Sequence, residues 1–297
     1  MVPSSVSDYA LKRLERCRMG AVHSVFATSL NVDMGALLLH IGCDDAPLSC
    51  LGLSLDAGET DRLLSCVEPG DRAVLHEGVL RLYGRFGVSE IDIAAAPIRA
   101  CGVVSLYGSV PEGVDSLIYD NLVNLDLLSK SGLPDDARIA RALAELSRYS
   151  AICAALTHDG DLAVHRVRID ASRRALSGTV EYLIGRGLGL TPSGDDVLCG
   201  YGCGLRFLHA GTQPDAWAFF TDVVANAMPG KTTAVSTAYL QAMIEGFANA
   251  DYLELLDAVA RGRPRQLPEL IGHVLDVGHT SGADSLLGFA AAFCCLF

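Results

Sequence analysis

Two copies of one short motif hold the residues whose types and spacing are best suited to chemistry. The first is Leu-Thr-Pro-Ser-Gly-Asp-Asp-Val-Leu-Cys-Gly at 190–200, and the second is His-Thr-Ser-Gly-Ala-Asp-Ser-Leu-Leu-Gly at 279–288. Aligned on their serines, both read Ser-Gly-x-Asp-x-Leu-x-Gly. Each copy places hydroxyl and carboxyl groups directly before an apolar helical stretch. It therefore combines hydrogen-bonding groups, acid–base groups and the start of a helix.

The motif has a structural interpretation and a functional one. Ser is a preferred N-cap residue, and an acidic residue three positions later can bond back to the cap, so Ser-x-x-Asp predicts capping boxes at 193–196 and 281–284. Capping does not require Gly194 and Gly282, because glycine in a helix costs up to about 1 kcal/mol relative to alanine. A helix N-terminus offers unpaired N–H groups and positive partial charge. The duplicated glycine therefore favours two corners that bind an anion or a carbonyl group.

A third cluster, Lys231-Thr232-Thr233 with Ser236 one turn later, opens another helical stretch. It resembles the end of a phosphate-binding loop, but the first glycine of that loop would fall at Ala225 and a helix precedes the cluster, so a Walker loop is rejected. An ammonium group and hydroxyl groups at a helix start can still hold an anion, with solvated capping as the alternative.

The elements that position these residues lie in the second part of the chain. Between residues 22 and 94, short apolar runs alternate with turn-rich clusters, which predicts a β-rich barrel or sandwich. Further on, apolar residues recur at helical spacing, and helices are predicted at 136–157, 172–185, 195–210, 215–228, 232–248, 251–261, 266–276 and 283–297. Alternation at 162–169 predicts a β-hairpin there. The predicted fold class is α+β, with a β-rich domain at 1–112 and an α-helical domain at 113–297 that carries both motifs.

Charge and hydropathy exclude several classes of protein. The chain of 297 residues has a formal net charge of −12 at pH 7 and no basic patch, so we expect no nucleic-acid or membrane-surface partner. Its longest apolar run, 286–297, is shorter than the roughly 18 residues of a membrane span. The N-terminus has basic residues among its apolar positions, unlike a signal peptide, so the expected location is the cytoplasm.

The chain is similar to the AllH family. The resemblance rests on three motifs in combination: Leu-Thr-Pro-Ser-Gly-Asp-Asp at 190–196, the Lys231 cluster and Gly-His-Thr-Ser-Gly-Ala-Asp at 278–284. The described member of this family is a subunit of oxamate carbamoyltransferase, from the allantoin degradation branch of purine catabolism. The resemblance covers most of the chain and is strongest in the helical half. It implies that oxalurate and phosphate give oxamate and carbamoyl phosphate, and it implies protein partner subunits.

The implied reaction assigns roles to the motif residues. It must hold a carboxylate and a phosphate in one site and stabilise charge on the carbamoyl oxygen. We expect phosphate to be bound at the Lys231 cluster. The whole expected substrate-binding set is Thr191, Ser193, Gly194, Lys231, Thr232, Thr233, Ser236, Thr280, Ser281 and Gly282. Acid–base or orienting roles are expected for Asp195, Asp196, His279 and Asp284.

Three aspartates beside an anion site need an explanation, because they repel the ligand. Asp196 and Asp284 can turn back to the helix caps. Asp195 cannot use that geometry, so it is the expected candidate for direct chemistry or, alternatively, for a Mg²⁺ ion that bridges to phosphate. Apart from this alternative, no cofactor and no metal site are implied.

Two other hypotheses remain open. The chain is alternatively a non-catalytic small-anion-binding or scaffold subunit, whose catalytic residues lie in a partner chain. In the third hypothesis it is an interaction protein with two ordinary capping boxes.

Overall fold

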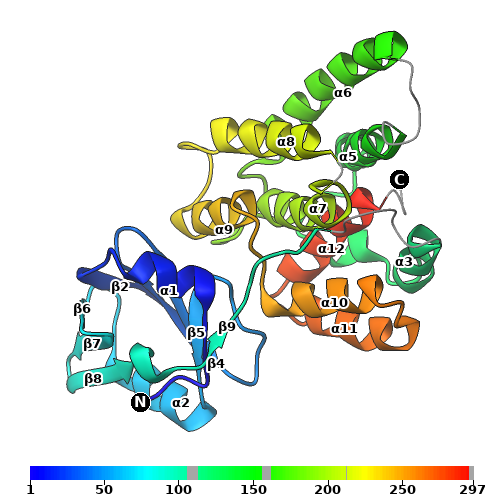
Figure 1. The fold of residues 1–297 in the computed structure, drawn as a ribbon. Coiled ribbons are helices and arrows are strands. Elements are labelled where there is room, and N and C mark those ends of the chain that lie inside the picture. Colours follow the sequence, from blue (N-terminus) through cyan, green and yellow to red (C-terminus); the bar gives the residue numbers. More distant parts are fainter. Residues whose placement is uncertain (106–112, 156–161, 212, 294–297) are drawn as a thin grey trace. The chain divides into compact units, whose positions relative to one another are not determined.

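The structure is a computed structural model that describes residues 1–105, 113–155, 162–211 and 213–293. It contains two compact units (Figure 1). The N-terminal unit comprises Met1–Gly102 together with Phe247–Leu253, and the helical unit comprises Val103–Gly246 together with Glu254–Phe297. The chain therefore returns to the N-terminal unit for one short stretch.

The N-terminal unit is built on one nine-stranded sheet that curls as a half-barrel. Its strands are β1 (Ser5–Ser7), β2 (Met19–Val25), β3 (Ser29–Asp33), β4 (Leu38–Cys43), β5 (Gly52–Leu55), β6 (Arg72–His76), β7 (Val79–Gly84), β8 (Gly87–Asp92) and β9 (Ile98–Arg99). Their order is β8-β7-β6-β2-β3-β4-β5-β1-β9, with parallel pairing only between β4 and β5 and between β1 and β9 among these strands. The predicted β-rich region is confirmed, as a single curled sheet.

Alternating apolar residues explain why these segments form strands. In β6 and β7, Ala73, Leu75, Leu80 and Leu82 are buried, while the residues between them are partly or fully exposed. A period of two turns one face of the sheet toward the core. The unit also contains α1 (Asp8–Leu14) and α2 (Ala57–Cys66), and the sequence pattern did not predict α2.

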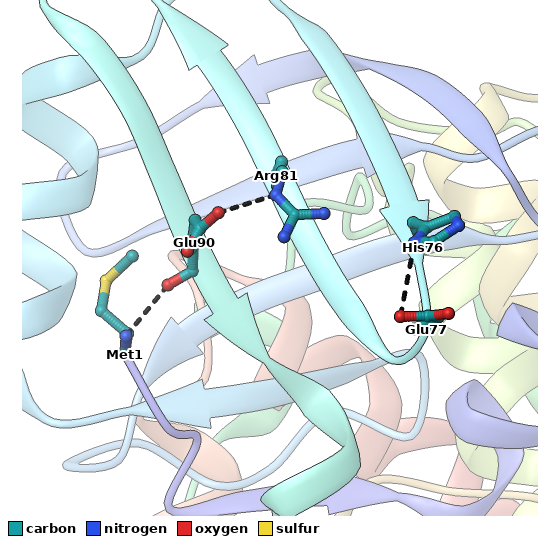
Figure 2. A network of polar contacts seen from close by, with 5 residues as sticks. All are labelled: Met1, His76, Glu77, Arg81 and Glu90. Carbon is teal, nitrogen blue, oxygen red and sulfur yellow. Dashed lines mark hydrogen bonds and ion pairs between the residues drawn. The ribbon is translucent and has the colours of Figure 1, made fainter.

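A polar network crosses the β6–β7–β8 end of the sheet (Figure 2). Arg81 Nε donates to Glu90 Oε1 over 2.7 Å between neighbouring positions of β7 and β8. The N-terminal ammonium of Met1 donates to the Glu90 carbonyl oxygen over 2.9 Å. His76 lies 3.9 Å from Glu77 at the turn that joins β6 to β7. Because these contacts are exposed, each stabilises the edge by about 1 kcal/mol or less.

The helical unit confirms the predicted α-helical second half. Its helices are α3 (Val114–Leu122), α4 (Leu127–Lys130), α5 (Ala137–Ala155), α6 (Leu162–Leu183), α7 (Ser193–His209), α8 (Pro214–Ala227), α9 (Ala234–Ile244), α11 (Leu267–Leu275) and α12 (Ser281–Ala292). Helix α10 (Ala250–Ala260) begins in the stretch that belongs to the N-terminal unit. Residues 156–157 and 294–297 of the predicted helices, and the predicted boundary at 112, lie outside the described residues.

The predicted β-hairpin at 162–169 is wrong, because these residues form the first turns of α6. No glycine, proline or asparagine lies between Asp161 and Ser177 to make a hairpin turn. The segment instead extends the strong helical pattern that follows it, and its carbonyl groups can then accept hydrogen bonds from N–H groups four residues later.

Helices α7 and α12 pack against each other at the centre of the helical unit (Figure 1). Val197, Leu198 and Tyr201 of α7 are fully buried, as are Leu286 and Phe289 of α12. In the part of the chain that the structure describes, no helix has the length and apolarity required to cross a lipid bilayer.

Candidate functional site

The two motif copies meet because α7 and α12 contact each other backbone to backbone. A Cβ atom at Gly200 would lie 1.9 Å from the carbonyl oxygen of Ser285, and one at Gly288 would lie 1.9 Å from that of Val197. Gly200 and Gly288 hold equivalent positions of the motif, and so do Val197 and Ser285. The contact is therefore reciprocal, and it sets the starts of both helices side by side.

The predicted capping boxes are wrong. Helix α7 begins at Ser193 itself, with Pro192 as its N-cap, and α12 begins at Ser281 with Thr280 as its N-cap. Neither cap residue makes a side-chain capping bond. A capping box needs the serine at the N-cap, but each serine lies one position inside its helix. The aspartate three positions later, Asp196 or Asp284, is therefore not placed to close a capping box.

The motif glycines allow the preceding helix to come close. A Cβ atom at Gly194 would lie 2.1 Å from the carbonyl oxygen of Leu183 in α6, and one at Gly282 would lie 2.1 Å from that of Val274 in α11. The Gly194 N–H donates to the carbonyl oxygen of Arg186 over 2.8 Å, and the Gly282 N–H donates to the carbonyl oxygen of Val277 over 3.0 Å. Both N–H groups are thus already used within the protein, so the glycines are explained without a ligand.

Asp195 ties three segments of the helical unit together. Its side chain is fully buried, and Oδ1 accepts a hydrogen bond from the Gly185 N–H over 2.8 Å. Oδ2 accepts from the hydroxyls of Thr232 and Ser236, the second over 2.7 Å. This geometry favours a positioning role for Asp195 over the direct chemistry expected from the sequence.

The hydroxyl groups of the Lys231 cluster are engaged in the same network. Thr232 and Ser236 donate to Asp195, while Thr233 donates to the carbonyl oxygen of Leu190 and accepts from the Ser236 N–H as the N-cap of α9. These hydroxyl hydrogens are therefore not available to an anion. Lys231 is exposed, and its long cationic side chain remains the member of the cluster suited to an anion.

Asp196 connects the two motif copies. Thr191 Oγ1 and Ser281 Oγ lie 3.0 Å apart, and both hydroxyls bond to the Asp196 carboxyl. Burial raises the pKa of this carboxyl well above its usual range, and repulsion from Asp284 and Asp195 acts in the same direction. The bonds from Ser281 and Thr191 oppose the rise in the pKa. Oδ2 of Asp196 is buried without a hydrogen-bond partner among the described residues.

Asp284 holds the equivalent position on α12 and is fully buried. Its Oδ1 accepts from the hydroxyl of Ser131 and from the Gly132 N–H, the latter over 3.2 Å. Its Oδ2, like that of Asp196, has no hydrogen-bond partner in the described part of the chain. The site therefore contains two buried carboxyl oxygens, one from each motif copy, that none of the described residues satisfies.

The loop at 131–132 is a part of the site that the sequence interpretation missed. A Cβ atom at Gly132 would lie 2.3 Å from Ser193 Oγ and 3.1 Å from Thr280 Oγ1, so this loop touches the start of both motif helices. The only signal in the sequence is that Ser131-Gly132 repeats the Ser-Gly pair of the motif. This signal is weak, because Ser177-Gly178 is also a Ser-Gly pair and lies in the middle of α6. Gly185 was likewise not singled out as a partner of Asp195.

His279, an expected acid–base residue, and one group of potential metal ligands are not part of the hydrogen bonds described above. His279 is exposed. The described residues contain one group of three potential metal ligands whose ligand atoms all lie within 4.8 Å of one another, and it consists of Cys43, Asp44 and Asp45 in the N-terminal unit. The motif aspartates are not part of it.

Two family models match the sequence. The model described as oxamate carbamoyltransferase subunit AllH matches residues 183–293, which contain both motifs and the Lys231 cluster. The model described as the AllH family N-terminal domain matches residues 3–98, which contain most of the curled sheet. No solved structure matches the chain. Because the two matches together cover most of the sequence, the chain belongs to the AllH family.

Proposed function

We propose that this chain is a carbamoyltransferase subunit that binds a small anionic amide or carbamoyl compound, such as oxamate, at the paired starts of α7 and α12. The observation that carries the proposal is the contact between the motif copies, in which the hydroxyls of Thr191 and Ser281 lie 3.0 Å apart and both bond to Asp196. This contact supports one shared site over two separate helix starts.

The proposed reaction transfers the carbamoyl group of oxalurate to phosphate. A phosphate oxygen attacks the carbamoyl carbon, the bond from that carbon to the oxamate nitrogen breaks, and this nitrogen takes up a proton as oxamate leaves. Asp196 suits the stabilisation of charge on the carbonyl oxygen, because its raised pKa favours the protonated carboxyl group that can donate a hydrogen bond. The proton that the nitrogen takes up comes from the attacking hydrogen phosphate. Lys231 suits the phosphate, and Asp195 positions the start of α9 beside it.

Ligand binding by the purified chain tests this proposal. Oxamate, oxalurate, phosphate and carbamoyl phosphate are added in turn, and melting temperature and calorimetric affinity are measured for the wild type and Ser281→Ala. A hydrogen bond to a charged ligand contributes about 1.5–3 kcal/mol, so Ser281→Ala should weaken binding about tenfold or more.

The matched control is Ser177→Ala, which removes a hydroxyl that bonds within α6, to the Arg173 carbonyl oxygen. It should leave the affinity unchanged. The proposal fails when none of the four compounds binds the wild type, or when the two serine variants bind alike.

One observation favours a second candidate, a small-anion-binding or scaffold subunit whose catalytic residues lie in a partner chain. Four of the expected site residues already use their side chains in hydrogen bonds within the helical unit: Asp195, Thr232, Thr233 and Ser236. Few groups are therefore left for chemistry. Phosphate-dependent oxalurate cleavage by this chain alone would exclude the second candidate. Turnover that begins only when partner subunits are added would support it.

A further inference from the structure

We propose that Asp196 and Asp284 form an amide-recognition pair, in which the Oδ2 atoms of both side chains contact one carboxamide or carbamoyl group and discriminate against a carboxylate of the same size. The inference rests on the proposed function and deepens it. It names the chemical group that the site recognises and the two residues that determine the specificity.

The first argument is the unpaired state of the two oxygens. Oδ2 of Asp196 and Oδ2 of Asp284 are both buried, and neither has a hydrogen-bond partner among the described residues. Buried carboxyl oxygens are nearly always paired in folded proteins, because an unsatisfied one carries the full penalty of lost hydration. A pair of them at one place indicates partners that arrive with a ligand.

The second argument is their common location. The two aspartates hold equivalent positions of the motif on helices that touch at Gly200 and Gly288, and they are close enough for Asp284 to disfavour ionisation of Asp196. Thr191 and Ser281, whose hydroxyls bond to Asp196, are themselves only half-buried.

The third argument is that the pair supplies one donor and one acceptor. Two carboxyl groups that repel each other in a desolvated site do not both ionise readily. Asp196 is the one that retains its proton, so its Oδ2 can serve as an O–H donor. Asp284 Oδ1 already accepts bonds from the Ser131 hydroxyl and the Gly132 N–H, so Oδ2 is the oxygen left to accept a bond from a ligand.

A primary amide complements this arrangement. Its carbonyl oxygen accepts the hydrogen bond from Asp196, and its NH₂ group donates to Asp284. A carboxylate has two acceptor oxygens and no donor, so one oxygen would face the Asp284 carboxylate with like charge. Oxamate and oxalate differ by this one replacement and have nearly the same shape, so they test the pair directly.

The experiment measures the dissociation constants of oxamate and oxalate by calorimetry at neutral pH. For the wild type we expect oxamate to bind at least tenfold more tightly than oxalate. Asp284→Asn keeps Oδ1 as the acceptor for Ser131 and Gly132 but puts an NH₂ donor in place of Oδ2. This variant should lower the oxamate preference at least tenfold.

Two controls separate recognition from net charge and from metal binding. Asp222→Asn makes the same change of charge at an exposed position of α8, and it should leave the oxamate-to-oxalate ratio as in the wild type. An excess of chelator should not change oxamate binding. Loss of binding in chelator would mean that a cation occupies the two oxygens, which overturns the inference.

The outcomes also separate this inference from the proposed function. Equal affinity of the wild type for the two compounds refutes the amide-recognition pair and leaves the binding site standing, and this result needs no variant to fold. An unchanged ratio in a folded Asp284→Asn variant refutes it as well. When neither compound binds and the other carbamoyl compounds also fail, the proposed function itself is wrong, and the inference falls with it.

Discussion

Asp195 and Asp196 are neighbours in the chain, but their carboxyl groups lie in different surroundings. The first accepts hydrogen bonds on both oxygens from Gly185, Thr232 and Ser236, whereas the second has one oxygen that no residue in the described ranges pairs. The sequence pointed to both residues because two carboxylates beside a serine and a glycine suit acid–base chemistry. It ranked Asp195 above Asp196 for direct chemistry, because it assigned Asp196 to the helix cap. The partners of Asp195 favour a positioning role instead, and no local pattern could show them because Thr232 and Ser236 lie about 40 residues away.

Replacing Asp196 by asparagine should stabilise the protein. The folded-state pKa of Asp196 is raised, so the unfolded chain releases this proton at a lower pH, and the free energy of unfolding falls as the pH rises from about 4 through the folded-state pKa. Asparagine does not titrate, so Asp196→Asn should be more stable by about 1 kcal/mol or more at neutral pH, with no gain near pH 4. Thermal melts across this pH range measure the difference.

Asp222→Asn provides the comparison for Asp196→Asn, because it removes an exposed carboxylate from α8 and should change stability by less than about 0.5 kcal/mol. An Asp196→Asn variant that is less stable than the wild type at every pH would show that the protein stabilises the Asp196 carboxylate, contrary to the geometry described above.

At the scale of elements, the sequence predicted helices well and their contacts poorly. Apolar residues at helical spacing correctly indicated α5 and α7 to α12. Ligand binding by Gly194 and Gly282 stays a prediction, but the sequence did not show the packing reason for these glycines. That reason depends on the ends of α6 and α11, and no local pattern shows that these carbonyl groups approach so closely.

Alanine at the crossing of α7 and α12 should destabilise the helical unit. At Gly200 or Gly288 the added methyl group would lie 1.9 Å from a backbone oxygen, which cannot move without displacing a helix. We expect Gly200→Ala and Gly288→Ala each to lower the free energy of unfolding by about 1–3 kcal/mol, measured by denaturant titration.

Gly178→Ala makes the same change in α6, where a Cβ atom would meet nothing within 4 Å. There the higher helix propensity of alanine should raise stability by up to about 1 kcal/mol. If all three variants behaved alike, the tight crossing of α7 and α12 would be refuted.

At the scale of the whole molecule, composition and periodicity gave the α+β class but not the path of the chain. The stretch Phe247–Leu253 belongs to the N-terminal unit, although it lies among helices of the other unit in sequence. There the ring of Phe247 packs 4.7 Å from that of Tyr9, and Asn249 Oδ1 accepts the Cys50 N–H over 2.9 Å. Contacts between residues so distant in sequence leave no periodic signal.

Asn249→Ala should therefore loosen the curled sheet. The change leaves the part-buried N–H of Cys50 without its acceptor, which costs about 1–3 kcal/mol. Hydrogen exchange followed by mass spectrometry should show faster exchange in β4, β5 and their neighbours, with α7 and α12 unaffected. Asn226→Ala, at an exposed position of α8, is the matched control and should change neither unit.

The reciprocal glycine contact also limits how the proposed ligand site can change within the family. The spacing between the starts of α7 and α12 is set by backbone atoms in direct contact at Gly200 and Gly288, not by interchangeable side chains. Substitutions elsewhere in the core can alter stability without widening the spacing between the two helix starts. A relative that accepts a bulkier substrate between the two helix starts should therefore carry a larger residue at one of these two positions, and that change would separate subfamilies by ligand size.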